Sequence, residues 1–75
     1  MNWKEYLNEG NTRTIFNNLD DMKQAERDLL QNKSLLFKIK IRNPATTQIK
    51  WKSSKDAEDA RKFFVSKNID VSMAK

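Results

Sequence analysis

The chain has 75 residues, with 15 Lys and Arg against 10 Asp and Glu, a net charge of +5, and neither Cys nor His. The length predicts one small domain over residues 1–75, and the missing residue types exclude disulfides, Cys or His metal sites, and catalysis by an imidazole or a thiol. A mean hydropathy of −0.89 argues against a membrane-spanning segment. The N-terminus lacks the apolar core of a signal peptide, so we expect a cytoplasmic protein.

A domain of this size has a small margin of stability, because a short chain buries only about 60% of the surface that it exposes on unfolding. Without a disulfide or a metal, it needs an efficient core, a bound ligand or a partner subunit. Association into a homodimer is therefore one expectation, and no cofactor is expected.

The first third of the chain predicts helices. Asn2 as an N-cap and Gly10 as a terminator favour a short helix over residues 3–8, with Trp3 and Tyr6 on one face. A helical spacing of apolar residues follows from Ile15 to residue 30 and is clearest over residues 20–32. The Asn and Asp residues at positions 17–21 favour a break in this stretch.

The middle of the chain predicts an antiparallel β-hairpin. Residues 35–42 form the first strand, in which apolar and cationic residues alternate from Phe37, and the pattern resumes over residues 48–52 after a turn at residues 43–47. Like side chains then face one another on both sides of the hairpin, which fixes the register and places Phe37 and Trp51 on the inner, core side. The expected pairs are Arg42 with Gln48, Lys40 with Lys50, Lys38 with Lys52, Ile41 with Ile49, and Ile39 with Trp51.

The last third predicts a helix capped by the serines at positions 53 and 54 and ending near Lys67, followed by a short third strand over residues 69–73. The expected fold class is α+β, with an N-terminal helix or helices, a central antiparallel hairpin, a C-terminal helix and this strand. From Lys38 to Met73, the order resembles the second half of an RRM-like or other split βαβ domain. The opening strand of such a domain is not evident in the sequence, and cations stand at the outward positions where RRM proteins stack bases on aromatics, so we assign no family.

The excess positive charge is confined to the middle of the chain. Residues 1–32 carry a net charge of −2, residues 33–55 carry +7 without any acid, and residues 56–75 are neutral. Like charges directly opposite one another on neighbouring strands are destabilising, by roughly 0.2–1 kcal/mol for each pair. An anionic partner explains such a face more readily than solvent does. The predicted site comprises the outward cations of the hairpin and two at its junctions: Lys38, Lys40, Arg42, Lys50, Lys52, Lys33 and Lys55.

This face predicts a non-catalytic protein that binds nucleic acid through its phosphates, with Arg42 as the bidentate contact. RNA is slightly favoured over DNA, because residues 12–32 carry more acid than base and supply no basic recognition helix. Two other interpretations stay open: the lysines keep an exposed hairpin edge soluble, or carboxylates from residues 20–28 fold over the face and neutralise it.

The alternative function is a small protein-interaction module, an inhibitor or adaptor of a larger enzyme or ribonucleoprotein that binds an acidic protein surface. Trp3 and Tyr6 would be its anchors. The Asn-rich, Lys-rich and Cys-free composition resembles that of phage accessory proteins. Catalysis is poorly supported. The acidic residues at the start of the last helix need no catalytic role, because negative side chains stabilise the N-terminus of a helix. A membrane role is not expected, because the cations lie on strands rather than on a helix face.

Overall fold

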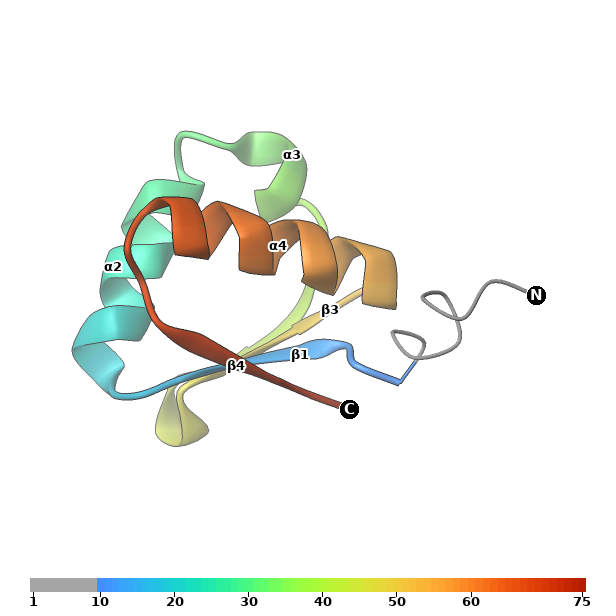
Figure 1. Ribbon diagram of the computed structural model, residues 1–75, viewed down its shortest axis with the longest axis horizontal. Coiled ribbons are helices and arrows are strands. Elements are labelled where there is room, and N and C mark those ends of the chain that lie inside the picture. Colours follow the sequence, from blue (N-terminus) through green and yellow to red (C-terminus); the bar gives the residue numbers. More distant parts are fainter. Residues whose placement is uncertain (1–9) are drawn as a thin grey trace.

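The computed structural model describes residues 10–75. Its elements, in chain order, are β1 (Arg13–Phe16), α2 (Leu19–Leu29), α3 (Lys33–Leu36), β2 (Ile39–Asn43), the 3-10 helix η1 (Pro44–Thr46), β3 (Gln48–Trp51), α4 (Ser54–Ser66) and β4 (Val71–Ala74). The four strands form one antiparallel sheet in the order β2-β3-β1-β4, and the helices lie on one side of it (Figure 1). The predicted α+β class is confirmed, whereas the helix predicted over residues 3–8 lies outside the described residues.

The opening strand β1 is the main difference from the sequence prediction, which places these residues in a helix. In the structure the burial of residues 13–16 alternates as in a strand: Thr14 and Phe16 are buried, and Arg13 and Ile15 are half-buried. β1 pairs with β3 on one side and with β4 on the other, so hydrogen bonds to two neighbours outweigh the local helical spacing. The resulting order of elements, β-α-β-β-α-β, is that of a split βαβ, or ferredoxin-like, domain.

The helix predicted over residues 20–32 is present as α2 but ends at Leu29. Asn32 then caps the N-terminus of the short helix α3, its side chain accepting a hydrogen bond from the Leu35 main-chain N–H. The predicted start of the first hairpin strand at Leu35 is therefore wrong. Phe37, which the alternation placed inside, ends α3 instead and is 69% exposed.

The hairpin itself is confirmed, and its register is correct at the end away from the turn. Ile39 pairs with Trp51, and the main-chain N–H of Lys52 donates to the carbonyl oxygen of Lys38 at 2.9 Å. Beyond this point a β-bulge at Lys40 shifts the pairing by one residue. The structure pairs Ile41 with Lys50, Arg42 with Ile49, and Asn43 with Gln48, which corrects the predicted partners of Lys40, Ile41 and Arg42.

The turn explains the bulge. Thr47 adopts a left-handed conformation with φ 51°, and its N–H donates to the carbonyl oxygen of Pro44 at 3.2 Å, so the turn closes with Asn43 opposite Gln48. Keeping Ile39 opposite Trp51 then requires one residue more in β2 than in β3, and Lys40 is that residue. Past the bulge the alternation is reversed, so that the side chain of Ile41 leaves the helix side of the sheet.

The core lies between the sheet and the helices. Trp51, Ile49 and Phe16 on the strands pack with buried residues of both long helices, and the ring of Phe64 meets that of Phe16 edge to face at 5.4 Å between centroids. Thr14 is fully buried and accepts a hydrogen bond from the indole N–H of Trp51 at 2.9 Å. The predicted C-terminal helix, capped by the Ser53 side chain, and the predicted last strand are both confirmed as α4 and β4. No helix within residues 10–75 combines the length and apolar character that a membrane crossing requires.

Candidate functional site

The face of the sheet opposite the helices is not covered by any element of residues 10–75, and we call it the open face (Figure 1). The alternation of buried and exposed positions along each strand determines which side chains lie on it. No strand of the sheet contains Asp or Glu. The open face carries Arg13 and Ile15 from β1, Ile41 and Asn43 from β2, Gln48 and Lys50 from β3, and Ser72 and Ala74 from β4.

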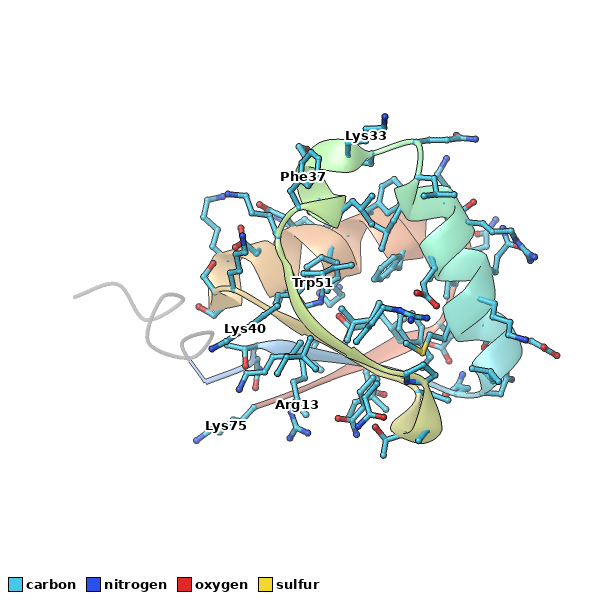
Figure 2. All side chains as sticks on the ribbon, turned by 180° about the vertical axis from the view of Figure 1, so that it is seen from behind. Arg13, Lys33, Phe37, Lys40, Trp51 and Lys75 are labelled. Carbon is cyan, nitrogen blue, oxygen red and sulfur yellow. The ribbon has the colours of Figure 1, made fainter. Side chains whose placement is uncertain are left out.

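A pocket of about 320 Å³ lies on this face and is lined by side chains from several strands. Three of its lining residues are cations, and none is a carboxylate residue. Figure 2 shows Arg13 and Lys75 on the side of the sheet away from Trp51, whose ring points toward the helices. The pocket, which we call the open-face pocket, is lined by Arg13, Ile41, Asn43, Gln48, Lys50 and Lys75.

Arg13 is held in place within the open-face pocket by two hydrogen bonds. Its Nη1 donates to Oε1 of Gln48 at 2.8 Å, and its Nε donates to the main-chain oxygen of Lys75. Because Oε1 of Gln48 is occupied, the amide of Gln48 presents its N–H groups to a ligand. Arg13, Gln48 and the two lysines therefore offer hydrogen-bond donors, the groups that bind anionic oxygens.

Two of the cations in the pocket lie directly opposite one another, because Arg13 of β1 pairs with Lys50 of β3. Such a like-charge pair destabilises a sheet by roughly 0.2–1 kcal/mol. Within residues 10–75 no Asp or Glu side chain forms an ion pair with either residue. An anion bound between them would supply the missing counter-charge.

The four lysines predicted for the hairpin are all free of ion pairs within the described part of the chain. Lys50 lies in the open-face pocket, and Lys40 lies at the bulge on the edge strand β2 (Figure 2). Lys38 and Lys52 adjoin one another at the end of the hairpin, where both are exposed. These lysines extend the positive charge from the pocket along the hairpin.

Arg42 does not belong to this set, and its predicted position among the outward cations is wrong. Past the bulge its side chain reaches Glu26 of α2, with Nε 2.5 Å from Oε2 and Nη2 2.9 Å from Oε1. This bidentate hydrogen bond and the attraction of the carboxylate raise the pKa of Arg42 above its ordinary value. The guanidinium thus links β2 to α2 on the helix side of the sheet.

The remaining predicted residues lie elsewhere. Lys33 begins α3, on the opposite side of the molecule from Arg13 (Figure 2). Lys55 lies in the first turn of α4, where its Nζ is 3.4 Å from Oδ2 of Asp59. Trp3 and Tyr6 fall outside the described residues. The predicted core position of Trp51 is confirmed by its complete burial.

Sequence reasoning missed Arg13 and Lys75. The sequence Arg-Thr-Ile-Phe does not alternate polar and apolar residues, so the β-propensity of Thr14, Ile15 and Phe16 was the only signal for the strand that holds Arg13. Lys75 enters the pocket only because β4 runs beside β1. The interpretation that carboxylates of residues 20–28 neutralise the predicted cations holds for Arg42, which pairs with Glu26, but for none of the hairpin lysines within the described residues, because α2 packs on the other side of the sheet. Residues 10–75 contain no cluster of three acidic residues that could hold a metal ion.

No family model, no curated protein and no solved structure matches this chain. The topology alone supports many functions, so the chemistry of the open face is the basis for assigning one.

Proposed function

We propose that the protein binds single-stranded nucleic acid non-catalytically across its open face, with RNA slightly preferred over DNA. The observation that carries this proposal is the open-face pocket, in which Arg13, Lys50 and Lys75 converge without a carboxylate residue. The phosphates of the ligand would occupy the positions beside these cations. Lys38, Lys40 and Lys52 would contact the phosphates that follow along the strand.

The shape of the face favours a single strand over a duplex. A sheet of four strands presents a broad surface, whereas the major groove of DNA admits a helix or a two-stranded ribbon. Ile15 and Ile41 lie among the cations and supply apolar contact for bases or sugars. None of the eight strand side chains on the open face is aromatic, so base stacking contributes little and sequence preference is low.

Two features favour RNA. Neither long helix has a basic N-terminal end that could enter a major groove. The first turn of α2 holds Asp20 and Asp21, and in that of α4 Lys55 stands beside Asp56 and pairs with Asp59. The amides of Asn43 and Gln48 border the pocket, where they can bond a 2′-hydroxyl.

Fluorescence anisotropy with a labelled single-stranded RNA, the matching DNA strand and the duplex tests the proposal. Six phosphate contacts predict a slope of about −4 for the logarithm of the binding constant against the logarithm of salt concentration. Between about 50 and 200 mM salt, the affinity would then fall about 300-fold. The expected order of affinity is RNA, then single-stranded DNA, then duplex.

Lys50→Gln should weaken binding to all sequences alike and reduce the slope by about 0.7. Lys62→Gln is the matched control, because it removes the same charge from an exposed position on α4. A binding constant that does not change with salt would contradict the proposal. So would a Lys50→Gln variant that binds as tightly as the control.

A further inference from the structure

A second surface lies on the helix side of the molecule, between α2 and α3. A pocket of about 370 Å³ is lined there by Lys23, Glu26, Arg27, Leu30 and Leu36, and we call it the helical groove. The first four residues follow the i, i+3, i+4, i+7 spacing that places side chains on one stripe of a helix. Leu36 comes from α3, which lies beside the end of α2 (Figure 1).

The floor of the helical groove is apolar. Leu30 is 61% exposed, and Leu36 packs against the core while one side stays open to the groove. A single exposed leucine is common on protein surfaces. Here, however, two leucines from different helices border one hollow, which is the arrangement that receives an apolar side chain of a partner.

The rim of the groove is positively charged. Both carboxylate oxygens of Glu26 are engaged by Arg42, at 2.5 and 2.9 Å, so Glu26 does not neutralise its neighbours. Arg27 donates to the neutral amide of Gln24 at 2.8 Å, and Lys23 forms no ion pair within residues 10–75. Two positive charges therefore flank the leucines, and neither forms an ion pair in the described part of the chain.

We propose that the helical groove binds an acidic amphipathic helix of another protein. An apolar side chain of that helix packs between Leu30 and Leu36, while its carboxylates lie against Lys23 and Arg27. The apolar floor favours a protein over nucleic acid. This function goes beyond nucleic-acid binding and uses other residues, so that both ligands can be held at once.

The probe for the experiment is a fluorescein-labelled helical peptide with one face of Leu and one of Glu. In anisotropy titrations, Leu30→Gln should weaken binding about tenfold, because it removes the apolar anchor. The double variant Lys23→Gln with Arg27→Gln should weaken it by a similar factor and reduce the salt dependence. The matched control is Val65→Gln, which changes a 53% exposed apolar residue on α4 and should leave the affinity within about twofold.

Four further results decide the matter. Amide shifts of an ¹⁵N-labelled sample that cluster around Leu30 and Leu36 on adding the peptide, together with unchanged RNA binding by Leu30→Gln, would support the proposal. Absence of peptide binding up to about 1 mM would overturn it. If Lys50→Gln abolished peptide binding and Leu30→Gln left it unchanged, the acidic peptide would bind on the open face, and the proposal would be overturned too. Loss of binding to phosphatidylserine vesicles in Leu30→Gln, without peptide binding, would assign the groove to lipid instead.

Discussion

The hydrogen bond between Thr14 and Trp51 is the one fully buried side-chain hydrogen bond within residues 10–75, and replacing Thr14 with Val tests what it contributes. Both residues are fully buried, and the indole N–H donates to the Thr14 hydroxyl at 2.9 Å. Val keeps the shape of Thr but cannot accept this bond. The indole N–H is then left buried without a partner, which costs about 1–3 kcal/mol. The extra buried methyl group offsets part of this loss, by up to about 0.8 kcal/mol.

We therefore expect Thr14→Val to lower the free energy of unfolding by about 1–2 kcal/mol. For a domain of this size, that corresponds to a fall in Tm of about 5–15 °C, measured by circular dichroism during thermal unfolding. The same substitution in a Trp51→Phe background should cost less, because Phe has no N–H to leave unpaired. Equal losses in both backgrounds, or an unchanged Tm in the single variant, would refute the reasoning.

Three other predictions follow from the ion pairs and the bulge. A hydrogen bond from Arg61 lowers the pKa of Glu58, so Glu58 stabilises the fold above the ordinary carboxyl pKa and loses this effect as the pH falls through its lowered pKa. Glu58→Gln should therefore reduce the free energy of unfolding at pH 7 by less than about 1 kcal/mol. Urea unfolding should show that this difference vanishes in acid. Arg42→Gln should leave RNA affinity within about twofold in anisotropy titrations, since its partner is Glu26; a large loss would return Arg42 to the site. Deleting Lys40 should leave an ordered hairpin in which Ile39 still faces Trp51, as amide NMR contacts would show; an unfolded product would contradict its role as the extra residue.

Much of the fold is evident in the sequence where one local signal dominates. The serine cap and acidic first turn predict α4, and the alternation of residues 48–52 predicts β3 with Trp51 inside. β1 has four residues and is followed closely by a helix, so the helical spacing of its neighbours conceals it. Its place in the sheet depends on two partner strands that are distant in sequence, and local propensity does not report such pairing.

The candidate site was predicted in part for the same reason. The alternation identified the hairpin lysines, and Lys50 is central to the open-face pocket. The alternation could not reveal the bulge. The extra residue of a bulge leaves the sequence alternation of apolar and cationic residues intact, but it reverses the side of the sheet to which every later side chain points. Arg42 was misplaced by this reversal. Arg13 was missed because its strand was missed.

The bulge in β2 also determines how two such molecules could associate through their sheets. β2 is an outer strand, and its irregular backbone, its charged residues and the proline that follows it at position 44 all hinder pairing with another strand. The opposite margin, β4, has the uncharged sequence Val-Ser-Met-Ala and no register shift against β1. A continuous sheet across two copies of the chain would thus have to join them at β4, which would align their positive faces on the same side.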